Sequence, residues 1–171
     1  MPDKVPALEE EGEPASYSLL VVEDTTDMLE FLAKNLGNTY TIHTSANGKE
    51  ALECLETTTV DLIISDIVMP HMDGFELLKS IRSDNMLCHI PFILLSALDS
   101  IDSKIAGLDY GADAYIEKPF SLSHMKATIN NLLENRRMLF NHFTTVPNMS
   151  YDQTLMNKTD VKWLNTINEI I

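Results

Sequence analysis

The chain has 171 residues, of which 12 are Lys or Arg and 26 are Asp or Glu, so its formal net charge is −14. This acidity excludes nonspecific DNA or RNA binding through a broad basic face, because neutralising phosphates requires many Lys and Arg side chains. It also argues against binding to anionic lipids. We therefore expect no direct nucleic-acid contact within this chain.

Hydrophobic residues make up 44% of the sequence, which is enough for a packed core. No apolar run approaches the roughly 20 residues that a membrane span requires. The two cysteines, Cys54 and Cys88, are too few for a disulfide framework or a zinc site. These features predict a cytoplasmic protein without membrane insertion in this chain, although its parent could be a membrane-bound sensor.

Short apolar runs that end in polar residues dominate the middle of the chain. Three of them cover residues 19–22, 62–64 and 92–95, and weaker candidates cover 40–44 and 114–117. Continuous apolar runs of this length are typical of strands that are buried on both faces of a parallel sheet. Before them, residues 1–17 contain three prolines and an acidic run, which predict a solvated leader or linker.

Apolar residues at helical spacing lie between and after these strands. They predict five helices, around residues 28–36, 51–55, 75–82, 101–108 and 122–139. Strands and helices thus alternate from residue 18 to about residue 140. This alternation predicts an α/β fold with a doubly wound sheet, helices on both faces and a functional crevice at the carboxyl ends of the strands.

Five polar side chains follow or end four of the predicted strands. Three are carboxylates, one is a hydroxyl and one is a lysine: Glu23, Asp24, Asp66, Ser96 and Lys118. Neighbouring carboxylates repel each other, and a hard cation such as Mg²⁺ relieves that repulsion through oxygen ligands. One carboxylate can then act as a nucleophile toward a phosphoryl group, while the lysine and the hydroxyl bind the phosphoryl oxygens.

These residues stand in motifs that resemble the response regulator receiver domains of two-component signalling. The motifs are LLVVED (19–24), DLIISDIVMPHMDGFEL (61–77), IPFILLSA (90–97) and GADAYIEKPF (111–120). The resemblance covers about 125 of the 171 residues. It implies a flavodoxin-like fold with five parallel strands in the order 2-1-3-4-5, five helices and, here, a C-terminal helical extension.

The resemblance also implies a role for each site residue. Asp66 is the phosphoacceptor, and Mg²⁺ is bound by Glu23, Asp24, Asp66 and the backbone carbonyl of Val68. Ser96 and Lys118 assist the transfer of the phosphoryl group. Ser96 and Tyr115 are the switch residues, and the peptide bond between Lys118 and Pro119 is cis. Gly74 is expected to supply a backbone conformation that other residues avoid.

We expect the receiver domain to cover residues 18–140. The residues that follow it, 141–171, are predicted to contain a linker and a further helix. Val161, Leu164, Ile167 and Ile171 share one face of this helix. The arrangement resembles hybrid sensor histidine kinases in which a receiver precedes an AraC-type helix-turn-helix domain. The expected partners are a histidine kinase domain, which could lie in the same parent chain, and a second copy after activation through the helix 4, strand 5 and helix 5 face.

Three other classes of function fit the sequence less well. A pseudo-receiver that only binds a partner would have an incomplete acidic pocket. A haloacid-dehalogenase type of phosphatase requires a second Asp two residues after the nucleophile, where Val68 stands. A dinucleotide-binding domain requires a G-x-G-x-x-G motif after the first strand, and no such motif follows it. We expect the chain to be a self-phosphorylating and self-dephosphorylating switch rather than an enzyme that acts on other substrates.

Overall fold

The computed structural model describes residues 16–97, 105 and 109–145. Five parallel strands form one sheet in the order β2-β1-β3-β4-β5, which confirms the predicted topology. The strands are β1 (Ser18–Val22), β2 (Thr41–Ser45), β3 (Leu62–Asp66), β4 (Phe92–Ser96) and β5 (Ala114–Glu117). The described helices are α1 (Thr26–Leu36), α2 (Gly48–Thr57), α3 (Gly74–Ser83) and α5 (Leu122–Thr145).

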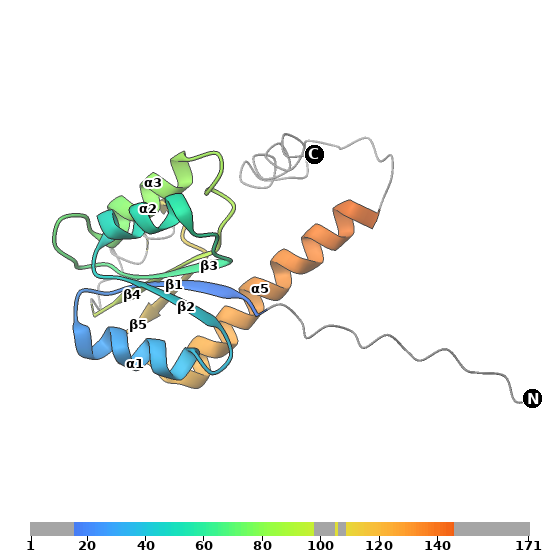
Figure 1. Cartoon of the computed structure of the whole chain (residues 1–171). Helices are drawn as coiled ribbons and strands as arrows, with labels where there is room; N and C mark the ends of the chain where they lie inside the picture. Colours follow the sequence, from blue (N-terminus) through green and yellow to red (C-terminus); the bar gives the residue numbers. More distant parts are fainter. Residues whose placement is uncertain (1–15, 98–104, 106–108, 146–171) are drawn as a thin grey trace, which may run out of the picture.

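Helices cover both faces of the sheet. Figure 1 shows α1 and α5 on one face and α2 and α3 on the other. Successive strand residues alternate between the two layers, so that Leu20 and Val22 belong to one core cluster and Leu19 and Val21 to the other. All four of these side chains are fully buried. The central strands are therefore apolar without interruption, which is why the sequence predicts a parallel sheet.

Four of the five predicted helices lie in the described part of the chain. The remaining one, expected around residues 101–108, falls almost entirely outside the described residues. The leader falls outside them up to residue 15, and so does the amphipathic segment 159–171. Tyr17 packs against the core cluster of the α1 and α5 layer, and its carbonyl accepts a hydrogen bond from Thr41 N–H at 2.9 Å.

Side chains cap the beginnings of α2 and α3. The Asn47 side chain accepts a hydrogen bond from Glu50 N–H at 3.1 Å. Asp73 and Glu76 form a reciprocal capping box at α3, because each side chain accepts a hydrogen bond from the backbone N–H of the other residue. The capping box fixes where α3 begins, directly after the loop that leaves the carboxyl end of β3.

The opposite edge of the sheet is held by a partly buried arginine at the end of α3. Arg82 forms an ion pair with Asp113 at 2.7 Å. Its guanidinium also donates hydrogen bonds to three backbone carbonyls, those of Cys88, Ile90 and Gly111. Asp113 in turn accepts a hydrogen bond from Phe92 N–H at 2.8 Å. The end of α3 and the beginnings of β4 and β5 are thus joined by one charged network.

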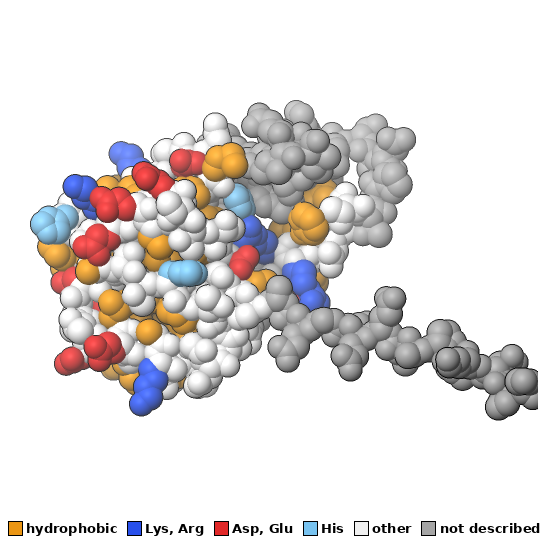
Figure 2. Space-filling view, in the orientation of Figure 1, with side chains coloured by type: hydrophobic (Ala, Val, Ile, Leu, Met, Phe, Trp, Pro, Cys, Tyr) orange, Lys and Arg blue, Asp and Glu red, His pale blue; other side chains and the backbone are white. Residues whose placement is uncertain are grey.

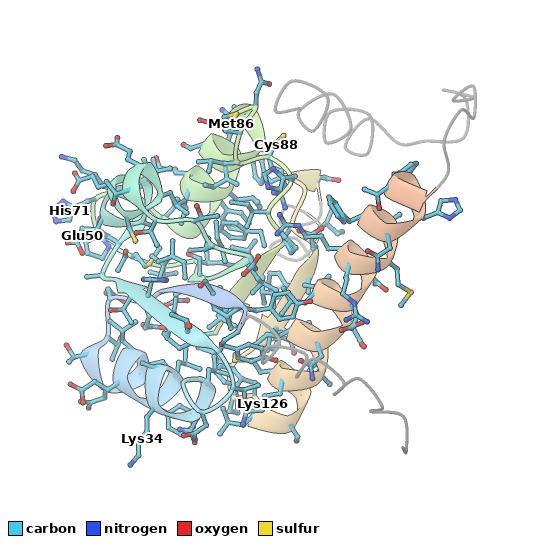
Figure 3. All side chains as sticks on the ribbon, turned by 45° about the vertical axis from the view of Figure 1, so that its right-hand side comes forward. Lys34, Glu50, His71, Met86, Cys88 and Lys126 are labelled. Atoms are coloured by element: carbon cyan, nitrogen blue, oxygen red, sulfur yellow. The ribbon has the colours of Figure 1, made fainter. Side chains whose placement is uncertain are left out.

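Helix α5 continues through residue 140, the predicted end of the receiver, and reaches Thr145. Its first half packs on the sheet through Met125, Ile129 and Leu133, which are at most 3% exposed. Figure 3 shows side chains filling the space between the helices and the sheet, with Lys126 labelled on this packed half of α5. Among the described residues, no helix is long and apolar enough to cross a membrane.

Acid is expected to destabilise this fold through His89. Burial and the nearby charges of Arg136 and Arg82 lower the pKa of His89 from 6.5 to about 4. Its Nδ1 atom is buried, and no described residue forms a hydrogen bond with it. Because the unfolded chain binds a proton more readily than the folded one, stability is complete above pH 6.5 and is lost as the pH falls toward 4, by about 2–3 kcal/mol.

Urea unfolding between pH 7.5 and 4 measures this effect. The His89→Gln variant should lose less stability across that range than the unaltered chain. His124→Gln removes an exposed histidine of α5 and is the matched control. If the free energy of unfolding depended on pH equally in the His89→Gln variant and the unaltered chain, His89 would not be the cause of the acid destabilisation.

Candidate functional site

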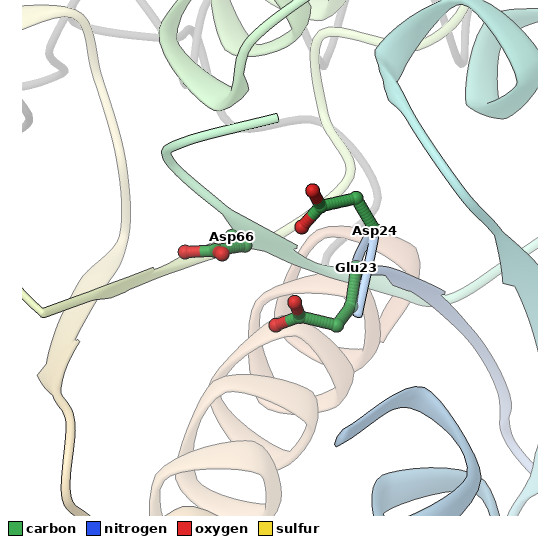
Figure 4. A group of neighbouring side chains, drawn as sticks. All are labelled: Glu23, Asp24 and Asp66. Atoms are coloured by element: carbon green, nitrogen blue, oxygen red, sulfur yellow. The ribbon is translucent and has the colours of Figure 1, made fainter. Parts of the chain in front are cut away.

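Three carboxylates meet at the carboxyl edge of the sheet. Glu23 and Asp24 directly follow β1, and Asp66 is the last residue of the neighbouring strand β3. One carboxylate oxygen from each residue lies within 4.8 Å of the others. Figure 4 shows the three side chains around one small space beyond the strand ends. The structure thus brings together the three carboxylates that the sequence predicts to converge.

Backbone groups orient two of these carboxylates. Glu23 Oε1 accepts a hydrogen bond from Thr25 N–H at 3.1 Å, and Glu23 N–H donates to the carbonyl of Ser45 at 3.1 Å. Asp66 Oδ1 accepts a hydrogen bond from Ile67 N–H at 2.8 Å. The other oxygen of this carboxylate, Asp66 Oδ2, lies beside the amine of Lys118.

Lys118 is the cation of this pocket. Its Nζ lies 2.8 Å from Glu23 Oε2 and 3.1 Å from Asp66 Oδ2. The residue follows β5, and its backbone N–H donates to the carbonyl of Ser96 at 2.7 Å. The peptide bond between Lys118 and Pro119 is cis. The lysine therefore links the carboxylates at the ends of β1 and β3 across the sheet edge.

Burial and charge shift the pKa values of the two residues in contact. Burial raises the pKa of Asp66, the positive charge of Lys118 offsets part of that rise, and the charge of Glu23 adds to it. Burial alone would lower the pKa of Lys118, but its hydrogen bond to Glu23 and the charge of Asp66 outweigh that effect and raise the pKa. Lys118 stays protonated at neutral pH.

The depth of the three carboxylates differs. Glu23 is 1% exposed and Asp66 is 8% exposed, whereas Asp24 is exposed to solvent. Val68 lies two residues after Asp66, and its side chain is 67% exposed. A hard cation that prefers oxygen ligands and retains several waters fits this donor set, because the site combines two deep carboxylates with an open outer side.

The predicted switch residues occupy two neighbouring strands. Ser96 ends β4, next to Asp66 at the end of β3, and is 1% exposed. Tyr115 lies on β5, packs against the core cluster of the α2 and α3 layer, and stays outside the ionic cluster of Lys118 with Glu23 and Asp66. Its hydroxyl is buried, and no described residue forms a hydrogen bond with it.

The sequence analysis expects Gly74 to supply a backbone conformation that other residues avoid, and this expectation is wrong. The described residues with a positive φ are His71, at 67°, and Gly111, at 89°. Gly74 is required instead by a close approach, because a Cβ at this position would clash with the carbonyl oxygen of Asp66. Its N–H donates to the carbonyl of Ile67 at 2.9 Å. Helix α3 thus begins directly against the backbone of the central carboxylate.

Sequence reasoning missed the groups that orient the site. These are the carbonyl of Ser45 and the N–H groups of Thr25 and Ile67. They are backbone atoms, so no residue type in the sequence signals them. It also missed the direct contact between Lys118 and Glu23, because it assigned the lysine only to phosphoryl oxygens.

Comparison with protein-family models identifies the class. Residues 19–130 match the response regulator receiver domain, and the chain belongs to this family. The receiver domain of the Francisella response regulator 1452 has a similar structure, with 36% sequence identity and a TM-score of 0.66. That likeness covers 70% of this chain and 98% of the Francisella domain.

Two curated relatives extend the comparison. A histidine kinase P4 of Formosa agariphila is 33% identical over 175 residues, which cover 99% of this chain and 13% of the kinase. A probable transcriptional regulator ycf27 of Cyanidium caldarium is 36% identical over 127 residues, which cover 74% of this chain and 50% of the regulator. The chain therefore spans half or less of the length of these relatives. The pseudo-receiver alternative is not supported, since the acidic pocket is complete.

Proposed function

We propose that this chain is the phosphoacceptor of a two-component signalling pathway and that Asp66 receives the phosphoryl group from a phosphohistidine of a histidine kinase. The observation that supports this most is the pocket itself. The Asp66 carboxylate is buried at the sheet edge, lies with Glu23 and Asp24 within 4.8 Å, and contacts the amine of Lys118 at 3.1 Å.

The transfer is a nucleophilic displacement at phosphorus. An Asp66 carboxylate oxygen forms a P–O bond while the P–N bond to the donor imidazole breaks, and the imidazole leaves with its electron pair and takes up a proton. We propose Asp66 Oδ2 as the attacking oxygen, because Oδ1 accepts a hydrogen bond from Ile67 N–H, whereas Oδ2 lies beside the Lys118 amine. Lys118 and the hydroxyl of Ser96 then bind the phosphoryl oxygens.

The residues proposed to hold Mg²⁺ are Glu23, Asp24, Asp66 and the backbone carbonyl of Val68. When bound, the ion supplies positive charge that offsets the repulsion between these carboxylates and the incoming phosphoryl oxygens. Lys118 supplies the second positive charge from the side of β5.

Phosphorylation is proposed to act as a two-state switch. Ser96 moves toward the phosphoryl group, Tyr115 turns inward, and the face formed by the fourth helix, β5 and α5 changes. We propose a homodimer as the activated form and transcription as the output. We further propose a cytoplasmic location. In the proposed domain organisation, residues 1–17 are a linker, residues 18–140 are the receiver, and residues 141–171 lead to an output domain. The proposed parent is a hybrid kinase in which that output domain is of the AraC type.

The function is tested by intact mass spectrometry after incubation with acetyl phosphate. We expect one phosphoryl adduct in the presence of Mg²⁺ and none when a chelator has removed the ion. Size-exclusion chromatography of the same samples should show a dimer only in the phosphorylated sample. An adduct that forms equally well without Mg²⁺ would contradict the proposed site, and so would an adduct of more than one phosphoryl group.

A further inference from the structure

The loop between β3 and α3, residues 67–73, contains the backbone carbonyl that is proposed to bind Mg²⁺, that of Val68. Hydrogen bonds fix both ends of this loop. At its beginning, Ile67 N–H donates to the carbonyl of Leu95 at 3.0 Å. At its end, Gly74 N–H donates to the carbonyl of Ile67 at 2.9 Å. The base of the loop is thereby held at the carboxyl edge of the sheet.

The outer part of this loop forms a strained turn. Met72 N–H donates to the carbonyl of Pro70 at 2.8 Å, which closes a three-residue turn around His71. His71 has a φ of 67°, in the left-handed region that residues other than glycine rarely adopt. Such a backbone conformation persists only where the surrounding structure holds it in place. The turn therefore requires support from a neighbouring part of the chain.

The loop between β2 and α2 supplies this support. Gly48 N–H donates to the carbonyl of Met72 at 3.1 Å. The two loops approach so closely that a Cβ on Gly48 would lie 2.7 Å from Met72 Cγ and 3.0 Å from the Met72 carbonyl oxygen. Gly48 is buried, and Met72 packs against the core cluster of the α2 and α3 layer. Only a residue without a side chain fits between the two loops.

Side chains at the beginning of α2 make this second loop rigid. The Glu50 carboxylate accepts hydrogen bonds from Ala46 N–H and from the Asn47 side-chain amide, both at 3.0 Å. Asn47 accepts a hydrogen bond from Glu50 N–H in return. Figure 3 shows Glu50 and His71 on the same side of the molecule. The first turn of α2 is thus fixed to the loop that precedes it.

The same loop also holds a carboxylate residue of the acidic pocket. The carbonyl of Ser45, the last residue of β2, accepts the hydrogen bond from Glu23 N–H. Ser45 is buried and lies shortly before Gly48 in the chain. Residues 45–50 therefore connect the backbone of Glu23 with the loop that contains Val68.

We propose that residues 45–50 position two ligands of the cation site. They hold the backbone of Glu23 through Ser45, and they hold the loop of the Val68 carbonyl through Gly48. They act through these two residues and are not ligands of the ion themselves. Groups that orient metal ligands in this way raise the affinity of a site for its metal. The inference rests on the proposed function, because it concerns the same site.

Replacing Gly48 by Ala should weaken Mg²⁺ binding about tenfold, because the added methyl group pushes against Met72 and displaces the loop. Met72→Ala alone should change the affinity less than about twofold, because its backbone carbonyl still accepts the hydrogen bond. The double variant Gly48→Ala/Met72→Ala should recover most of the loss, since it lacks the Met72 Cγ and Sδ atoms that the methyl group meets. Isothermal titration with MgCl₂ measures each affinity.

Replacing Glu50 by Ala tests the same loop without adding an atom between the two loops. It removes the hydrogen bonds to Ala46 and Asn47, so Mg²⁺ binding should weaken about threefold. Glu53→Ala is the matched control, because both glutamates are exposed on α2. Figure 2 shows several acidic side chains on the surface over α2 and α3. The control removes one such charge and should change the affinity less than about twofold.

Hydrogen exchange without Mg²⁺ separates this positioning from a general loss of stability. In the Gly48→Ala and Glu50→Ala variants, exchange should accelerate about tenfold more at Met72 and Gly74 than at Leu20 in β1. Equal acceleration at all three residues would overturn the inference. Unchanged Mg²⁺ affinity in both variants would also overturn it and would leave the proposed function standing. If the unaltered chain bound no Mg²⁺, the proposed function would fail together with this inference.

Discussion

The Asp66→Asn variant is expected to take up no phosphoryl group from acetyl phosphate, even at saturating Mg²⁺. The amide lacks the nucleophilic oxygen charge that attacks phosphorus. The variant should remain folded, because the Asn side chain oxygen can still accept the hydrogen bond from Ile67 N–H that Asp66 Oδ1 accepts. Intact mass spectrometry detects the adduct, and circular dichroism verifies the fold.

Asp27→Asn is the matched control for this experiment. Asp27 is an exposed carboxylate in the first turn of α1, close in sequence to the acidic pair but not part of the carboxylate cluster. This variant should form the same adduct as the unaltered chain. A full adduct on the Asp66→Asn variant would mean that another side chain accepts the phosphoryl group.

Replacing Lys118 by Met should separate metal binding from phosphoryl transfer. The Lys118 amine contacts both Glu23 and Asp66, so its removal leaves these carboxylates without their cation. Mg²⁺ should therefore bind about tenfold more tightly, a difference of ~1.4 kcal/mol. Phosphorylation should nevertheless slow by about 100-fold, because the charge that stabilises the phosphoryl oxygens is lost.

Isothermal titration with MgCl₂ and a time course of adduct formation give the two quantities. Lys126→Met, which removes a lysine of the sheet-packed half of α5, is the control for charge alone (Figure 3). It should change neither quantity by more than about twofold. Weaker Mg²⁺ binding in the Lys118→Met variant would show that the lysine orients the carboxylates rather than competing with the cation.

Most of the fold could be predicted from the sequence, because the hydrophobic patterns that indicate its strands and helices are local. Runs such as Leu19–Val22 are apolar at every position, and this pattern requires burial on both faces of a sheet. The polar residues after these runs then fall at one edge without further assumptions, as Asp66 and Asp24 do. The strand order came instead from the resemblance to receiver domains, since periodicity does not distinguish neighbouring strands.

The structural features that the sequence did not predict depend on contacts between segments that lie far apart in the chain. Gly74 is needed because α3 begins against the carbonyl of Asp66, which a turn preference cannot reveal. No sequence motif marks His89, yet the fold places it near Arg82 and Arg136, which lie far apart in the chain. Such effects arise from burial and charge in three dimensions rather than from the spacing of residue types.

The position of the phosphoryl group tests the central claim most directly. Borohydride reduction converts an aspartyl phosphate to homoserine, so peptide mass spectrometry of the reduced chain locates the acceptor. After phosphorylation by a phosphohistidine donor with Mg²⁺, we expect homoserine at position 66 and unmodified carboxylates at Glu23 and Asp24. Reduction at either of those residues, or a phosphoryl group on a side chain outside the acidic pocket, would contradict the account.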